Sequence, residues 1–86
     1  MDGVKHPRYA MGMTHDLDAT GLLCPLPVLK LRKRLAGVAS GDVVTLRADD
    51  PAAIVDVPHF CAEAGHTLVD TQTEGMVQVY HVRKGG

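Results

Sequence analysis

The spacing of hydrophobic residues in this chain alternates between the period of a strand and that of a helix, and this alternation strongly limits the possible fold. Half-buried strands place apolar residues at every second position, whereas amphipathic helices place them three or four positions apart. The pattern predicts six elements in this order: a short strand at 17–19, a helix at 25–38, a strand at 42–48, a helix at 50–65, and strands at 66–73 and 76–83.

Each predicted helix has one face suited to a hydrophobic core. The first has a stripe made of Val28, Leu31, Leu35 and Val38, and the second has one made of Ile54, Val57, Cys61 and Ala64. Asp50 followed by Pro51 predicts the start of the second helix, and Gly65 predicts its end. Pro58 lacks the N–H group that an interior helical turn requires, so we expect a kink or a restart there.

This order of elements predicts an α+β fold, a two-layer α/β sandwich in which two helices cover one face of a four-stranded mixed sheet. Strands joined through helices favour parallel pairing by right-handed crossovers, and the turn at Glu74 and Gly75 predicts a final antiparallel hairpin. A chain of 86 residues has room for one such domain. Residues 1–15 follow neither period, so we expect a flexible N-terminal arm followed by a single domain at 16–86.

The composition argues against several classes of function. A formal net charge of −1 and only three aromatic residues do not favour a surface that grips nucleic acid or an anionic membrane. No apolar run approaches the ~20 residues of a membrane span, and the N-terminus lacks the apolar core of a secretory signal. Cys24 and Cys61 lie far apart and form no Cys-x-x-Cys motif. We therefore expect a cytoplasmic protein with reduced thiols.

Cys24 lies where the first strand and turn end and the first helix begins. The prolines that follow, Pro25 and Pro27, fit the first turn of a helix, where backbone N–H groups have no intrahelical partner. Pro25 also favours extended geometry at Cys24, as expected of an N-cap residue. Leu26 precedes a proline as well, so the alternative is a helix that starts at Pro27 with Cys24 one step outside it. The helix dipole then predicts a lowered pKa for the Cys24 thiol. Cys61, by contrast, is predicted to be a buried apolar filler.

The motifs around Cys24 and from Ala48 onward make the chain resemble the TusA/SirA family of sulfur carriers. The matching residues run from about position 15 to the C-terminus: Leu17-Asp18, Gly21-Leu22, Cys24-Pro25-Leu26-Pro27, Ala48-Asp49-Asp50-Pro51, Asp56-Val57-Pro58, Phe60-Cys61, His66 and Val82-Arg83-Lys84-Gly85-Gly86.

This resemblance implies the same two-layer fold and makes Cys24 the residue that carries sulfur as a persulfide. The implied donor is a cysteine desulfurase or a rhodanese-like protein, and the implied recipient is a downstream acceptor protein. No cofactor or metal is expected. In the best-known branch the sulfur continues to 2-thiouridine in tRNA, and other branches serve sulfur oxidation or other sulfur trafficking. Leu23 and Leu26 stand where that best-known branch has charged residues, so the donor and acceptor stay open.

The residues next to Cys24 suggest a docking surface for these partners. Leu23, Leu26 and Leu29 lie away from the predicted buried stripe and form what we call the leucine patch. Lys30 and Lys33, in a run of four basic residues with Arg32 and Arg34, could steer an acidic partner. The alternatives are that the arm or the sheet covers the leucines and that the basic residues form an ordinary solvated face.

Several acidic and glycine residues are candidates for support of this loop. Asp18 and Gly21 are expected to shape the turn before Cys24, and Asp50 is expected to cap the second helix. Because parallel strands end at the same edge of a sheet, Asp49 and Asp50 are expected near the sulfur. Asp49 could then oppose thiolate formation or receive a proton.

Three other readings remain to be weighed. The terminal Gly85-Gly86 pair occurs in ubiquitin-like carriers that bear a thiocarboxylate, but those begin with a β-hairpin. A zinc site could be drawn from Cys24, Cys61, His59 and His66, although the spacings match no common finger. A non-catalytic regulatory module is the third reading, and it predicts that Cys24→Ser is harmless.

Overall fold

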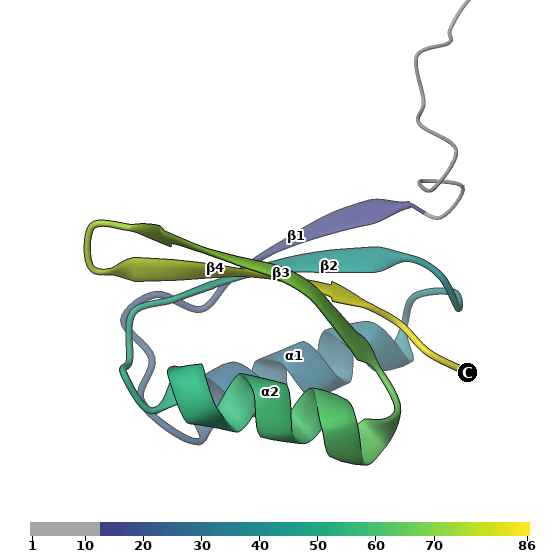
Figure 1. Ribbon diagram of the computed structural model, residues 1–86, viewed down its shortest axis with the longest axis horizontal. Helices are drawn as coiled ribbons and strands as arrows, with labels where there is room; N and C mark the ends of the chain where they lie inside the picture. The colour runs from purple at the N-terminus through teal and green to yellow at the C-terminus, as the bar shows by residue number, and fades with distance from the viewer. Residues whose placement is uncertain (1–12) are drawn as a thin grey trace, which may run out of the picture.

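The structure, a computed structural model, describes residues 13–86, which form one four-stranded sheet with two helices packed against one of its faces (Figure 1). The predicted fold class is confirmed. The elements are the strand β1 (Thr14–Asp18), the helix α1 (Leu26–Ala36), the strand β2 (Val43–Ala48), the helix α2 (Ala53–Ala64) and the strands β3 (Thr67–Glu74) and β4 (Val77–Arg83).

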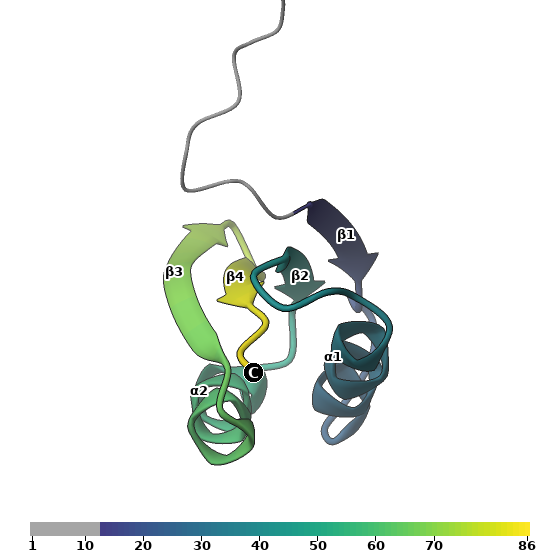
Figure 2. The ribbon, with the colours of Figure 1, turned by 90° about the vertical axis from the view of Figure 1, so that its right-hand side faces the viewer.

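The strands lie side by side in the order β1-β2-β4-β3. β1 and β2 are parallel, as a strand–helix–strand unit requires, and β4 is antiparallel to both of its neighbours. The final hairpin is therefore confirmed, and it inserts β4 between β2 and β3. Seen along the strands, α1 lies beneath β1 and α2 beneath β3, so the two helices run next to each other (Figure 2).

The core lies between the sheet and the helices. Its largest fully buried side chains are Tyr80, Leu31, Leu35, Leu46, Val44, Val57 and Val82, with Val79 buried as well. Cys61 is also buried, at 2% exposure, which confirms its predicted packing role. In α1 the predicted stripe is broadly right, although Val28 and Val38 are only partly buried at its edges.

The predicted face of α2 is partly wrong. Ile54 is 52% exposed, and Phe60 is buried in its place. Most of α2 is apolar, so its periodicity fits more than one orientation, and the larger aromatic ring gains more from burial. Pro58 lies inside a continuous helix that begins at Ala53, three residues after the predicted cap at Asp50. Gly65 ends α2 with φ +80°, as predicted.

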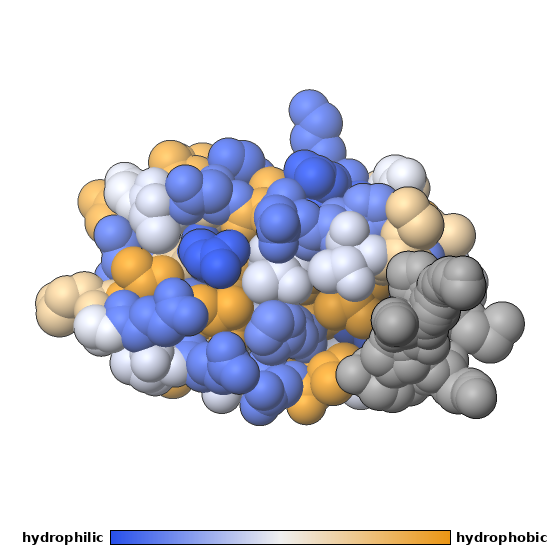
Figure 3. All heavy atoms as spheres, turned by 90° about the horizontal axis from the view of Figure 1, so that it is seen from above, coloured by the Kyte–Doolittle hydropathy of each residue, from blue (hydrophilic) through white to orange (hydrophobic). Residues whose placement is uncertain are grey.

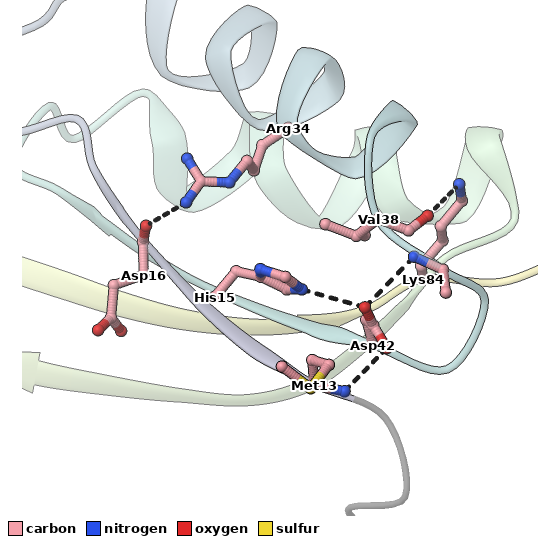
Figure 4. A network of polar contacts seen from close by, with 8 residues as sticks. Met13, His15, Asp16, Arg34, Val38, Asp42 and Lys84 are labelled. Carbon is pink, nitrogen blue, oxygen red and sulfur yellow. Dashed lines mark hydrogen bonds and ion pairs between the residues drawn. The ribbon is translucent and has the colours of Figure 1, made fainter.

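β1 begins earlier than predicted because Asp42 holds its first residues (Figure 4). One carboxylate oxygen of Asp42 accepts a hydrogen bond from the Met13 N–H, and the other lies 3.0 Å from Nε2 of His15. These contacts lower the pKa of Asp42, the His15 contact most of all. Strand pairing therefore includes Thr14, which the sequence placed in the arm; residues 1–12 of that arm lie outside the described residues.

The sheet face opposite the helices is mainly hydrophilic (Figure 3). One cross-strand row on it consists of Asp16, Thr45, His81 and Asp70. Oγ1 of Thr45 lies 3.1 Å from Nδ1 of His81 within this row. Cys24 lies at the end of the sheet, where the loop after β1 meets the loop after β2.

Candidate functional site

Cys24 lies in the loop between β1 and α1 and is exposed to solvent. The loop after β2 holds it by two hydrogen bonds that cross between the loops. Asp50 Oδ2 accepts from the Cys24 backbone N–H at 2.5 Å, and Asp49 Oδ1 accepts from the Gly21 N–H at 2.9 Å. The predicted closeness to Cys24 is therefore present for Asp50, whereas Asp49 contacts Gly21 in the same loop; both contacts arise because β1 and β2 end at the same edge.

Asp50 thus has a different role from the predicted helix cap. Its other carboxylate oxygen accepts from the Ala52 N–H at 3.1 Å, within the turn that precedes α2, and Ala52 itself is the N-cap residue. Asp50 connects this turn to the backbone of Cys24, so it fixes the position of one loop relative to the other.

Asp18 and Gly21 shape the turn that leads to Cys24. Asp18 Oδ1 accepts hydrogen bonds from both the backbone N–H and the hydroxyl of Thr20, and these bonds lower the pKa of Asp18. Gly21 has φ +81°, a backbone conformation that residues other than glycine rarely adopt. The chain therefore reverses at Gly21 and places Cys24 at the rim of the two loops.

Of the two arrangements predicted for the start of α1, the structure has the one in which Cys24 lies outside the helix, although α1 begins at Leu26 and not at Pro27. Pro25 is the N-cap residue, α1 begins at Leu26, and the Cys24–Pro25 peptide bond is cis. Cys24 therefore lies one residue before the cap. Pro27 lies in the first turn and is buried, as its place in the motif allows.

The contact of the Cys24 thiol with Asp56 was not predicted from the sequence. The Cys24 Sγ donates a hydrogen bond to Asp56 Oδ2 across 3.0 Å. This bond raises the pKa of Cys24, with smaller contributions in the same direction from partial desolvation and from the negative charges of Asp56 and Asp50. The predicted lowering of the Cys24 pKa is therefore wrong, because the hydrogen bond to Asp56 and the charges of two nearby carboxylates favour the protonated thiol.

An open hollow of about 320 Å³ lies beside the sulfur between the two helices. Its lining residues are Cys24, Pro25, Val28, Arg32, Asp56, His59, Phe60 and Glu63. Arg32 lies over the Phe60 ring, with its guanidinium carbon 5.8 Å from the ring centroid. Nε2 of His59 lies 3.6 Å from the Glu63 carboxylate. The hollow leaves space for a group from another molecule to approach the thiol.

The family model for the sulfurtransferase TusA matches residues 15–84, which include all of this site. The chain belongs to the TusA family. The SirA-like protein from Desulfitobacterium hafniense has a similar solved structure, with a TM-score of 0.71 and 27% sequence identity. The match covers 86% of this chain and 100% of that one. Proteins of the TusA family are sulfurtransferases that carry sulfur in relay with partner proteins.

All five residues predicted for partner docking in this TusA-family protein are exposed. All three side chains of the leucine patch are exposed, Leu23 most of all at 70%. Ile54 and Val55 in the first turn of α2 add two further exposed apolar side chains, which the sequence analysis missed. The role of the leucine patch in docking stays a prediction.

The basic residues of α1 have more than one role. Lys30 Nζ donates to the backbone carbonyl of Asp18 at 2.9 Å, and Arg34 donates to that of Asp16 at 3.0 Å. These two side chains therefore connect α1 to β1. Lys33 lines a separate hollow beside them, and steering by Lys30 and Lys33 stays a prediction.

The zinc reading gains no support from the geometry. Within residues 13–86, no group of three or more potential ligands lies close enough together to hold a metal ion. Cys61 is buried in the core while Cys24 is exposed. Across the same described residues, no helix has the length and apolar character needed to cross a membrane.

The C-terminal glycine pair has a structural explanation in part. The Gly85 N–H donates to Nδ1 of His66 at 3.0 Å. A Cβ atom at Gly85 would lie 1.8 Å from the carbonyl oxygen of Gly65, so only glycine fits without a shift of backbone. Gly85 is therefore accounted for by packing against the turn that ends α2.

Proposed function

We propose that Cys24 accepts sulfane sulfur as a persulfide and passes it to an acceptor protein. One observation supports this most directly. Of the two cysteines in the chain, Cys24 is exposed at the rim of an open hollow, whereas Cys61 is buried. Sulfur transfer between proteins requires a thiol that another cysteine can reach, since exchange rates depend on access as well as on the thiolate fraction.

The loading step needs no oxidant. The Cys24 thiol loses its proton, and its sulfur attacks the outer sulfur of a donor persulfide. A bond forms between Sγ and that sulfur, while the sulfur–sulfur bond of the donor breaks. The electron pair leaves on the donor thiolate, which takes up a proton. The products are a Cys24 persulfide and a donor thiol, and discharge to an acceptor repeats the exchange in the other direction.

The proposed donor is a cysteine desulfurase or a rhodanese-like protein, and the recipient is a downstream sulfur-acceptor protein. The exposed leucine patch next to Cys24 supports docking of a protein surface, because apolar side chains gathered at one place on a surface favour protein contacts. We propose a relay toward 2-thiouridine in tRNA as the first pathway to assay. A carrier for sulfur oxidation or another cofactor pathway is the alternative, and it predicts no transfer of sulfur from this protein to tRNA.

The test is intact-mass spectrometry after incubation with a cysteine desulfurase, cysteine and pyridoxal phosphate. Wild type and Cys61→Ser should each gain one sulfur atom, which a thiol reductant removes, and Cys24→Ser should gain none. A parallel reaction uses thiosulfate and a rhodanese. If the wild type gains no sulfur from either donor, the persulfide role is wrong and the regulatory-module reading replaces it.

The docking surface is tested separately with Leu26→Glu. Val69→Glu is the matched control, because Val69 is an exposed apolar residue on β3. β3 is at the opposite edge of the sheet from β1, beneath which α1 lies (Figure 2). Loading and discharge should slow in Leu26→Glu and stay unchanged in Val69→Glu. Unchanged rates in both variants would remove the leucine patch from the docking surface.

A further inference from the structure

Asp56 touches the reacting atom, although the sequence predicted no role for it at the sulfur. It belongs to the first turn of α2, and its carboxylate reaches the thiol of Cys24 in the opposite loop at 3.0 Å. A carboxylate can only accept a hydrogen bond, so this contact requires the sulfur to carry its proton. The geometry therefore favours the thiol over the thiolate.

The surrounding charges strengthen this preference. Asp50 places a second carboxylate at the backbone of Cys24. The basic side chains that line the hollow have other contacts. Arg32 lies over the Phe60 ring, and His59 lies near Glu63. Within residues 13–86, no basic side chain is within ion-pair distance of Asp56. A thiolate at Cys24 would thus face two carboxylates, neither of which has an ion-pair partner among the described residues.

We propose that Asp56 holds unloaded Cys24 in its unreactive thiol form and that a docking partner releases it by presenting a lysine or arginine to Asp56. This inference rests on the proposed function, because it concerns the same sulfur transfer. A cation paired with Asp56 withdraws the carboxylate from the thiol and offsets its charge. The proton of Cys24 then leaves, and it compensates for the proton that the departing donor thiolate takes up.

The partner chemistry follows from charge complementarity at the hollow. Asp56 is partly exposed, so a side chain entering the open hollow can reach it. A basic residue placed beside the donor's own persulfide would pair with Asp56 as the two sulfurs approach each other. The carrier would then react quickly with a docked donor and slowly with thiol reagents in solution.

The first experiment measures the rate of Cys24 alkylation by iodoacetamide against pH, with the modified peptide quantified by mass spectrometry. Asp56→Asn keeps the shape of the side chain and removes its charge. For each unit by which the thiol pKa falls, the thiolate fraction at neutral pH rises about tenfold while each thiolate becomes about threefold less nucleophilic. We therefore expect Asp56→Asn to be alkylated about threefold faster than the wild type at neutral pH for each unit by which its thiol pKa falls, with the pH profile shifted to lower pH.

Asp70→Asn is the matched control, because it makes the same substitution at an exposed residue of β3 that does not line the hollow. Its alkylation profile should match the wild type. Circular dichroism melts of all variants show whether they fold, and Asp56→Ala gives a second test of the same position. A wild-type profile in both Asp56 variants would overturn the proposal.

The second experiment measures loading by a cysteine desulfurase at several salt concentrations. Asp56→Asn should show a higher KM and a weaker salt dependence than the wild type, because the proposed pairing with the donor's cation is gone. Faster alkylation together with slower loading is the expected combination. An unchanged salt dependence would overturn release by a basic residue. Absence of loading in the wild type would instead refute the proposed function, while the alkylation profile would still report on Asp56.

Discussion

Replacing Tyr80 with phenylalanine should stabilise this protein, because the buried hydroxyl of Tyr80 has no partner among residues 13–86. The side chain lies in β4 and is 1% exposed, packed in the core beneath the sheet. Within residues 13–86, its hydroxyl oxygen makes no hydrogen bond. Burial also raises the pKa of Tyr80, as expected for a group removed from water.

The magnitude follows from the cost of desolvating a polar group. A buried hydroxyl with no partner costs about 1–3 kcal/mol, and Tyr80→Phe removes that cost while the ring and its contacts remain. We expect the free energy of unfolding to rise by about 1 kcal/mol, at the lower end of that range. For a domain of this size, such a change raises Tm by about 4–8 °C.

Urea unfolding and thermal melts, both followed by circular dichroism, measure the change. Tyr80→Leu is the control, because it removes the ring together with the hydroxyl and should lower stability through lost packing. A loss of about 1 kcal/mol or more in Tyr80→Phe would refute the reasoning, since a loss of that size is typical of a broken hydrogen bond.

Three further predictions concern stability. The pKa of Asp42 is lower in the folded than in the unfolded protein, so its contribution to stability is present above the ordinary value of 3.8 and is lost as the pH falls. In urea titrations, the free energy of unfolding of Asp42→Asn should therefore fall less in acid than that of the wild type. Gly85→Ala should lower Tm, because its Cβ would lie 1.8 Å from the Gly65 carbonyl oxygen, whereas Gly37→Ala, whose Cβ would have its nearest neighbour at 3.6 Å, should not. Cys61→Ser should lower the free energy of unfolding by about 1–3 kcal/mol in urea while the alkylation rate of Cys24 stays the same.

The order of elements and the position of Cys24 could be predicted because both depend on local sequence. Hydrophobic spacing distinguishes helices from strands without tertiary information, and prolines restrict the chain just after Cys24. The meeting of Asp49 and Asp50 with the cysteine loop also followed from topology, since parallel strands end at one edge. The location of the site is therefore visible in the sequence.

The electrostatics of the site could not be predicted in the same way. Asp56 lies 32 positions from Cys24, and their contact depends on how the first turn of α2 is rotated toward the loop. That rotation is set by burial of Phe60, which the pattern of α2 did not distinguish from burial of Ile54. The same error placed Ile54 in the core, although its side chain is exposed. An argument from the helix dipole alone therefore gave the wrong direction for the pKa of Cys24.

The most direct test of the central claim locates the transferred sulfur on the chain. Wild-type protein is loaded by a cysteine desulfurase, trapped with an alkylating agent, digested and mapped by tandem mass spectrometry. We predict one additional sulfur atom on the peptide that contains Cys24, and its transfer to an acceptor protein when one is added. Additional sulfur on the Cys61 peptide or at Gly86, with none at Cys24, would contradict the account.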